Sequence, residues 1–313
     1  MTAIAKASPL LALVLSLNGC IYPGEWGDSE RFKQDFQKTF QLQPGGAVSV
    51  ENFNGSIDIL GWDEASVQVN ATKFASTKDL LDSLEVDMTG SPTEVHIRTL
   101  RSEAFWQGSQ GVRYSLRVPK RIKLDRIVSS NGAIRIEDVN GNAQVRTSNG
   151  AIRVDGLTGD LEAQTTNGRI EIRGLDGNAN VHTSNGTIDA ESTHGSFDAS
   201  TSNGRIAAVL KDPNTSRPVR LQSSNGRLEL RIDGSALPPI HARTTNSRIV
   251  VFLPASANAR LEARTTHGSV TSEFDDLNRS RSRRERELDG NIGHGGPLIE
   301  LESTNGSIQV LKR

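Results

Sequence analysis

The chain has 313 residues, in which 36 lysine and arginine residues nearly balance 37 aspartate and glutamate residues. This balance argues against a surface built to bind polyanions and against a disordered acidic chain. Aromatic residues are only 4% of the chain and 29 residues are glycine, a composition that favours many short, regular strands over one deep globular core.

The N-terminus carries the features of an export signal. The apolar run PLLALVLSLNGC spans residues 9–20 and ends at Cys20, the single cysteine of the chain. It is shorter than the roughly 20 apolar residues of a membrane-spanning helix, and it is typical of a secretory signal. Its ending, Leu17-Asn18-Gly19-Cys20, resembles the lipobox of bacterial lipoproteins, in which the cysteine is acylated. We therefore expect a lipoprotein signal peptide over residues 1–19 and a membrane anchor at lipidated Cys20; an ordinary cleaved signal with an incidental cysteine is the alternative.

The next hundred residues show no clear repeat. We expect the lipidated cysteine and a tether over residues 20–40 and irregular β coils over residues 41–125. In the second region VSVENFNGSIDILGW has the form of one coil, and VQVNATKF, EVHIRTL and VRYSLRVP are candidate strands. The stretch TKDLLDSLEV favours a helical turn.

Residues 126–313 repeat the pattern Ser/Thr-Asn-Gly-x-Ile. The intervals between copies are first 18 residues and then 22, 21, 21 and 38, with His267 replacing the asparagine in one copy. A second turn signal, such as Asn140-Gly141, lies nine residues after the first, so each period holds two short strands and two turns. The asparagines that mark the copies are Asn131, Asn149, Asn167, Asn185, Asn203, Asn225, Asn246 and Asn305.

The repeated columns discriminate between two β folds. Three residues after each asparagine stands an aliphatic residue, usually isoleucine, and two before it stands threonine or serine. An antiparallel meander suits each Asn-Gly turn, but it would hold equivalent residues two strands apart. In a parallel β-helix or solenoid of about 18–22 residues per coil, equivalent residues stack about 4.8 Å apart, and Thr, Asn and Ile ladders can form. We predict this all-β fold, with corners where Asn and Gly tolerate a left-handed backbone.

The longer intervals predict loops that leave the stack at a corner. They are KDPNTSRP (211–218), DGSALPPI (233–240) and a charged loop over residues 274–297. The last contains RSRSRRER (279–286) between acidic residues, which indicates a solvated, self-paired loop rather than a nucleic-acid-binding patch.

The assembled motifs resemble a known family. PGGAVSVENFNGSIDILGWD, YSLRVP, the repeated TSNGxI coils and GNIGHGGPLIELESTNGSIQV together resemble a bacterial adhesin-like family of unknown function, over roughly residues 41–313. Members are extracytoplasmic right-handed β-helices. The resemblance implies a fold and a compartment, and it brings no catalytic residues.

Motifs for metal or cofactor chemistry do not occur in the sequence. There is no HExxH motif, and one cysteine excludes a cysteine-rich zinc site. His194 and His267 occupy turn positions of the repeat. Glycan-cleaving β-helices need acids clustered on one face, whereas acids and bases are interspersed over the outward columns here. We therefore expect no metal, no cofactor and no catalytic residues.

One outward column is rich in arginine and forms the best candidate for binding. We call this column the arginine strip; it comprises Arg169, Arg205, Arg227 and Arg248, beside the hydroxyls of Ser202, Ser224 and Thr245. The planar guanidinium fork suits the carboxylate or phosphate of an anionic glycan. The alternative is that these residues only keep an exposed sheet soluble.

The sequence as a whole predicts a non-enzymatic lipoprotein of the cell envelope that acts as an adhesin-like binding or structural module. Ile21 follows Cys20 in place of the aspartate that often retains lipoproteins at the inner membrane, which favours the outer membrane. The expected partners are the membrane and an anionic glycan or envelope protein, but no nucleic acid. An envelope-stress or signalling accessory and a glycan-active enzyme are the alternatives.

Overall fold

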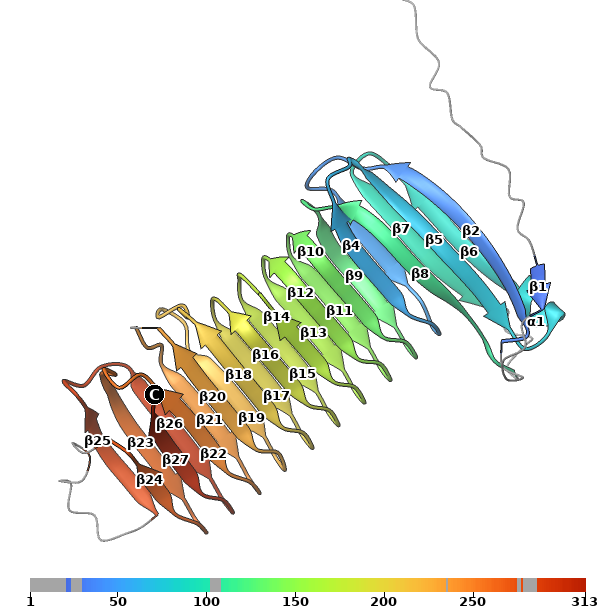
Figure 1. Ribbon diagram of the computed structural model, residues 1–313. Coiled ribbons are helices and arrows are strands. Elements are labelled where there is room, and N and C mark those ends of the chain that lie inside the picture. The colour runs from blue at the N-terminus through green and yellow to red at the C-terminus, as the bar shows by residue number, and fades with distance from the viewer. Residues whose placement is uncertain (1–20, 24–29, 102–107, 235, 275–276, 278–285) are drawn as a thin grey trace, which may run out of the picture.

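The computed structural model describes residues 21–23, 30–101, 108–234, 236–274, 277 and 286–313. These residues form a rod of two β-sheets, with 14 strands in sheet A and 13 in sheet B (Figure 1). The chain winds from one sheet to the other along the rod, so the predicted all-β solenoid is confirmed. Within the described residues, no helix is long and apolar enough to cross a membrane.

In the regular part of the rod, each coil gives one strand to each sheet. Sheet B receives β9 (Lys123–Ser129), β11 (Ala143–Thr147), β13 (Leu161–Thr165), β15 (Ala179–Thr183), β17 (Phe197–Thr201), β19 (Val219–Ser223) and β21 (Ile240–Thr244). Sheet A receives β10 (Ile134–Asn140), β12 (Ile152–Thr158), β14 (Ile170–Arg173), β16 (Ile188–Thr193), β18 (Ile206–Lys211), β20 (Leu228–Asp233) and β22 (Ile249–Leu253). Neighbours are parallel, and Ile152 pairs with Ile134 on one side and Ile170 on the other. This register excludes the meander.

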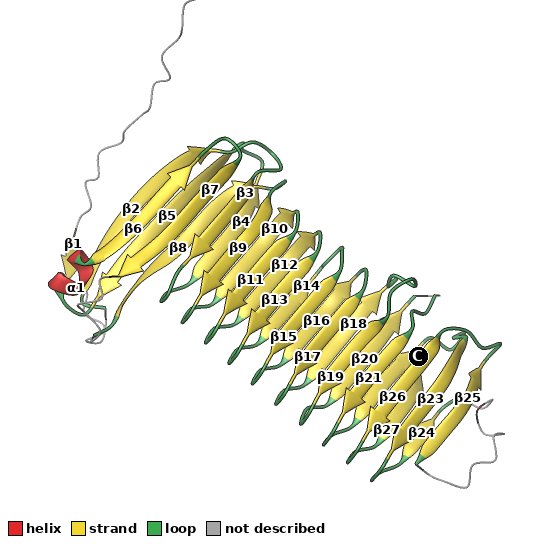
Figure 2. Ribbon diagram, turned by 180° about the vertical axis from the view of Figure 1, so that it is seen from behind, coloured by secondary structure: helices red, strands yellow, loops and turns green. Residues whose placement is uncertain are grey.

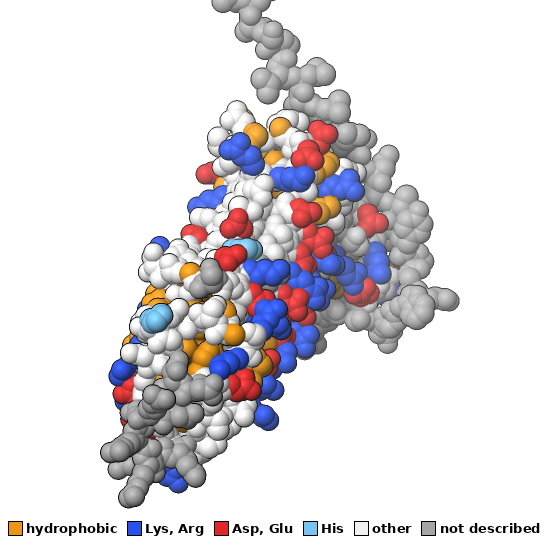
Figure 3. All heavy atoms as spheres, turned by 60° about the vertical axis from the view of Figure 1, so that its left-hand side comes forward, with side chains coloured by type: hydrophobic (Ala, Val, Ile, Leu, Met, Phe, Trp, Pro, Cys, Tyr) orange, Lys and Arg blue, Asp and Glu red, His pale blue; other side chains and the backbone are white. Residues whose placement is uncertain are grey.

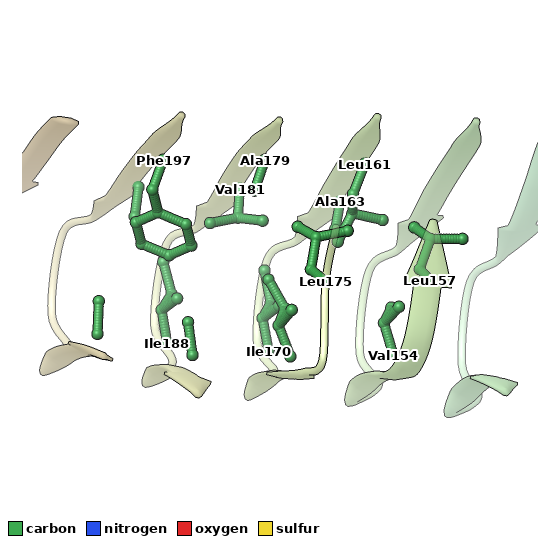
Figure 4. Packing of buried hydrophobic residues seen from close by; sticks show 14 of the residues in the cluster. Val154, Leu157, Leu161, Ala163, Ile170, Leu175, Ala179, Val181, Ile188 and Phe197 are labelled. Carbon is green, nitrogen blue, oxygen red and sulfur yellow. The ribbon is translucent and has the colours of Figure 1, made fainter. Parts of the chain in front are cut away.

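The isoleucine column fills the space between the sheets. Ile170 and Ile188 are 0% exposed, and they point into an interior that Val181 and Phe197 enter from sheet B (Figure 4). Burial of one such side chain contributes about 1.5–3 kcal/mol. Because buried and outward positions alternate along each strand, every second residue is left for the surface.

The Asn-Gly corners carry the predicted asparagine ladder. These corners lead from a strand of sheet B to the next strand of sheet A. Asn149 Nδ2 donates to Asn131 Oδ1 at 2.8 Å, and Asn305 donates to Asn246 at 2.8 Å. The intervening bonds, at 2.7–2.8 Å, join Asn167, Asn185, Asn203, Asn225 and Asn246 to the preceding asparagine. Each amide between the two ends of the ladder uses one N–H donor and its oxygen in these bonds.

The threonine column joins the coils differently from the expected ladder. Thr165 Oγ1 donates to the carbonyl oxygen of Gly150, one coil away, at 3.0 Å, and Thr183 Oγ1 donates to that of Gly168 at 3.1 Å. Both hydroxyls are buried. The bond therefore satisfies a buried donor and a corner carbonyl together.

In the regular coils the glycines of the Asn-Gly corners are needed for space and not for a left-handed backbone, contrary to the expectation; Gly55, in the corner between β3 and β4, is the exception, with φ of 114°. The φ angle of Gly168 is not in the left-handed region. A Cβ there would lie 1.9 Å from the carbonyl oxygen of Gly150. The second corner does use the left-handed region, for example at Gly195, where φ is 108°.

At the N-terminal end the order of coils differs from the order of the chain. β3 (Ala47–Glu51) and β4 (Ile57–Trp62) form a coil that lies between β9–β10 and the coil of β7 (Glu94–Arg101) and β8 (Gln110–Pro119). The coil predicted over 48–62 and the strands predicted from EVHIRTL and VRYSLRVP are thus confirmed.

Antiparallel strands cover the outer side of the β7–β8 coil. β5 (Ser66–Ala75) pairs with β8, β2 (Phe32–Gln41) with β5, β1 (Ile21–Pro23) with β2, and β6 (Leu84–Gly90) with β7. The predicted helical turn is α1 (Lys78–Asp82), at this end of the rod (Figure 2).

The tether predicted over residues 20–40 is wrong at residues 21–23, which form β1 and pair with β2, and from residue 32 onward, where β2 begins. The physical reason is that Phe36 and Phe40 pack against the main core, while Phe32 packs against Leu80 and Leu81 of α1. The predicted signal peptide and Cys20 lie outside the described residues.

Two lysines cover the outer edge of β6, the terminal strand of sheet B. Lys38 Nζ donates to the carbonyl oxygen of Met88 at 2.9 Å, and Lys73 Nζ donates to that of Leu84 at 2.7 Å. Burial lowers the pKa of Lys73, opposed by Asp82 and Glu85. Charged side chains at a sheet edge hinder pairing with another chain.

The C-terminal end also departs from chain order. β26 (Leu298–Ser303) lies between β21 and β23 (Ala259–Thr265), and β27 (Ile308–Lys312) lies between β22 and β24 (Val270–Ser272). The last coil of the sequence is therefore held on both sides. The loop predicted over 274–297 is corrected in part, because β25 (Glu287–Ile292) within it pairs antiparallel with β23. Its arginine run lies outside the described residues except for Arg286.

Candidate functional site

The structure places the arginine strip in one column, as predicted. Each arginine immediately precedes a strand of sheet A: β14, β18, β20 and β22 in turn. The side chains of Arg169, Arg205 and Arg227 are 55%, 49% and 39% exposed. Ser202, Ser224 and Thr245 lie exposed before the asparagine ladder.

Carboxylates already occupy most of the strip. Arg169 Nη1 lies 3.0 Å from Glu171 Oε1, and Arg227 Nη2 lies 3.0 Å from Glu229 Oε2. Arg205 pairs with Asp189. Figure 3 shows the same intermixing, with basic and acidic side chains lying side by side on the visible face. An anionic ligand would have to displace these carboxylates from the guanidinium groups.

The local electrostatics agree with this geometry. Hydrogen bonds from Arg169 and Arg153 lower the pKa of Glu171, while partial burial opposes the shift. Such surface pairs contribute about 0–1 kcal/mol each. In the described part of the chain Arg248 has no carboxylate partner. Three of the four arginines of the strip are thus paired with carboxylates, and Arg248 is the exception.

The insertions of the repeat gather at the second corner, which leads from sheet A to the next strand of sheet B. The predicted loops 211–218 and 233–240 are confirmed between β18 and β19 and between β20 and β21. The segment 254–258 also leads from a strand of sheet A to one of sheet B, whereas 293–297 joins β25 to β26 within sheet B. In repeat proteins, insertions on one face often mark the binding face.

A groove of about 460 Å³ runs along this corner over five successive coils, from β11 to β19. We call it the corner groove. Its wall is formed by Asn142, Asp160, Asn178 and Ser196. Its floor consists of the outward side chains at the starts of β11, β13, β15 and β17, which are Gln144, Glu162, Asn180 and Asp198. At the other end of the groove, Arg217 lies just before β19 and Arg220 lies on it, in register with Asp198.

The wall of the corner groove is tied together from coil to coil. The backbone N–H of Asp160 donates to Asn142 Oδ1 at 2.9 Å, and Asn178 Nδ2 donates to Asp160 Oδ1 at 2.8 Å. Ser196 Oγ donates to Asn178 Oδ1 at 2.7 Å. These bonds fix the wall before any ligand arrives.

The floor differs from the wall because three of its four side chains have no partner among the described residues. Among the residues that the structure describes, Gln144, Glu162 and Asn180 make no side-chain hydrogen bond or ion pair. Asp198 Oδ2 lies 3.8 Å from Arg220 Nη1. Burial raises the pKa of Asp198, and Arg220 opposes that shift. A ligand can therefore use the floor without breaking existing contacts.

Sequence reasoning missed the corner groove. Its floor changes residue type from coil to coil, so it leaves no conserved column within the repeat. Two signals in the sequence could have found it. Gln144, Glu162, Asn180 and Asp198 alternate with buried positions along their strands and so point outward, and the insertion at 211–218 lies beside them.

Metal chemistry has no support in the described part of the chain, where no group of three or more His, Cys, Asp or Glu residues could hold an ion. His194 and His267 lie at corners, where their backbone N–H groups donate to Leu175 and Thr304.

Comparisons with known proteins identify the family. A family model described as Toastrack DUF4097 matches residues 49–238. A solved candidate adhesin from Bacteroides fragilis is 10% identical, with coverage of 89% of this chain and 97% of that chain and a TM-score of 0.41. A candidate lipid-binding protein from Parabacteroides distasonis is 10% identical, with coverage of 89% and 96% and a TM-score of 0.32. No curated protein matches the chain significantly. Because the family model covers more than half of its residues, the chain belongs to the Toastrack DUF4097 family.

Proposed function

We propose that the protein is a non-enzymatic binding module of the cell envelope, anchored at the outer membrane through lipid on Cys20, and that an extended polar ligand such as a glycan occupies the corner groove. The observation that carries the proposal is the line of unpartnered polar side chains, Gln144, Glu162 and Asn180, along one hollow. In ligand sites, polar groups that converge in a concavity fix the orientation of the ligand and provide specificity.

The form of the rod suits this role. Neighbouring strands lie about 4.8 Å apart, so the corner groove begins about 30 Å along the rod from β1, the strand nearest to Cys20. An anchor at Cys20 would hold one end at the bilayer and leave the groove several coils away from it. The wall is already ordered, so binding costs little further conformational entropy.

The pairing of the acids favours binding over catalysis. Asp160 Oδ1 accepts hydrogen bonds from Asn178, and Asp198 lies 3.8 Å from Arg220, so Glu162 is the one acid of the groove without such a partner among the described residues. Glycoside hydrolases use two carboxyl groups, one on each side of the scissile bond. The floor amide of Asn180 lies between Glu162 and Asp198 and offers hydrogen bonds instead of proton transfer.

Binding of three protein variants to a glycan array tests the proposal. Wild type, the groove variant Gln144→Ala/Glu162→Ala/Asn180→Ala and the strip variant Arg227→Ala/Arg248→Ala are compared on the same array. We expect bound glycans to be lost by the groove variant and retained by the strip variant. The reverse result would move the site to the arginine strip.

Two further readouts address the alternatives to this function. Shortening of a bound polysaccharide would establish an enzyme. Absence of any glycan binding, together with specific capture of one membrane protein from envelope extracts, would favour the signalling accessory.

A further inference from the structure

The charges of the corner groove are separated along its length. Asp160 and Glu162 lie together on one coil, and no cation pairs with either in the described part of the chain. Arg217 and Arg220 lie at the other end. Glu162 and Arg220 are three coils apart in register, about 14 Å between backbones. The groove therefore has an acidic coil near one end, next to the neutral Asn142 and Gln144, and a basic coil at the other.

The space between the two ends is suited to hydroxyl groups. Asn180 stands in the middle of the floor with a free amide, which offers two donors and one acceptor. Asp198, the remaining floor residue, is held near Arg220 and leaves Arg217 without a carboxylate partner among the described residues. Only one of the two arginines is thus partly neutralised.

From this arrangement, and resting on the proposed role of the groove as the binding surface, we propose that the corner groove binds a zwitterionic glycan in one direction. Ammonium groups of amino sugars lie over Asp160 and Glu162, hydroxyls lie over Asn180, and a carboxylate or phosphate lies at Arg217 and Arg220.

The repeat of the rod supports a chain that runs parallel to its axis. The floor presents one side chain per coil, about every 4.8 Å, which is close to the advance of an extended glycan per sugar. Successive sugars can therefore meet successive coils. The floor has no aromatic platform, since all four of its side chains are polar, so recognition depends on charge and hydrogen bonds rather than on stacking against sugar rings.

The test measures the affinity of the full chain for four oligosaccharides of equal length by calorimetry. One alternates glucuronate with glucosamine bearing free amino groups and so carries both charges. The others are its N-acetylated form, which is anionic, a glucosamine oligomer, which is cationic, and a neutral glucose oligomer. We expect the zwitterionic oligosaccharide to bind most tightly.

Charge-removing variants locate the two ends. Glu162→Gln and Arg217→Gln each change an exposed side chain, so the fold should be kept. Each should weaken binding of the zwitterionic oligosaccharide by about tenfold, as the loss of a charge-assisted hydrogen bond does. Only Arg217→Gln should weaken the anionic oligosaccharide, and only Glu162→Gln the cationic one. The matched control, Arg169→Gln on the arginine strip, should change none of these affinities.

The possible outcomes separate this inference from the proposed function. Equal binding of neutral and charged oligosaccharides that still depends on Asn180 would keep the groove as the site but overturn the zwitterionic ligand. No binding of any saccharide would overturn both. Binding of an alternating Lys-Glu peptide in place of every saccharide would replace the glycan by a protein partner.

Discussion

The glycine of each Asn-Gly corner makes a sharp prediction about stability. The φ angle of Gly168 lies outside the left-handed region. If backbone conformation alone decided the effect, Gly168→Ala would stabilise the fold by about 0.4–1 kcal/mol, because alanine restricts the unfolded chain more than glycine does. The packing of the coils predicts the opposite sign. A Cβ at residue 168 would lie 1.9 Å from the carbonyl oxygen and 2.6 Å from the carbonyl carbon of Gly150, which are backbone atoms that no rotamer change can move.

The size of the effect follows from the separation that the Cβ would force. The two coils must part by about 1 Å to remove the clash. The nearby backbone bonds from Asn167 to Ser148 and from Ile152 to Arg169 are 2.9 Å long, and an added 1 Å takes them out of hydrogen-bonding range. Loss of two such bonds at about 1 kcal/mol each, with the cost of overpacking, gives a destabilisation of about 2–4 kcal/mol.

Urea unfolding followed by circular dichroism measures this difference. The matched control is Gly290→Ala in β25, where the nearest atom to a new Cβ is the movable Leu277 Cδ2 at 3.0 Å. We expect a large fall in the urea midpoint for Gly168→Ala and little change for the control. An unchanged or higher midpoint for Gly168→Ala would refute the steric account of the corner.

Three further predictions follow from the core, the surface and the N-terminus. Ile170→Asp should cost more than about 3 kcal/mol, because it leaves a charge unpaired in the core; a wild-type melting curve would reject the inward position of Ile170. Glu171→Gln should lower stability by less than about 1 kcal/mol at neutral pH. The pKa of Glu171 is lowered in the fold, so this loss should fade as pH falls below about 4, and a loss that grows in acid would contradict the pairing. Cys20→Ser should move the protein from the membrane to the soluble fraction, and unchanged membrane partition would rule out the lipid anchor.

The sequence predicted the regular coils because the same residue types recur in it at fixed intervals. Ile152 and Ile170 recur in register because each packs on the other. Asn149 and Asn167 recur because each amide bonds the next. Such columns can be found without a structure, since stacking requires like residues at like positions.

The ends of the rod could not be predicted in the same way. Equivalent coils carry equivalent columns, so the repeat does not say which coil lies beside which. Asn305 could have extended the stack beyond His267, but it bonds Asn246 instead. The phenylalanines at 32, 36 and 40 fit a helix or a strand equally in sequence, and only their contacts with the core and α1 decide for β2.

Of the two candidate binding surfaces, one could be found from the repeat and the other could not. The arginine strip was visible as a column, although its pairing with Glu171, Asp189 and Glu229 shows that a column of charge need not be a free surface. The corner groove was not visible, because Glu162 and Asn180 share a position but not a residue type.

The most direct test of the account is disulfide trapping of the coil order. In a Cys20→Ser background, Arg243→Cys with Glu302→Cys joins positions 59 residues apart that pair in register on neighbouring strands, within the Cα separation of about 4.4–6.8 Å that a disulfide needs. Arg243→Cys with Arg264→Cys joins positions much closer in sequence, but β26 lies between them. The stacked rod predicts rapid oxidation of the first pair and none of the second. Oxidation of the second pair alone would contradict the inserted coil, because coils stacked in chain order would bring those two positions together. Oxidation of neither pair would contradict the stacking that positions both the strip and the groove.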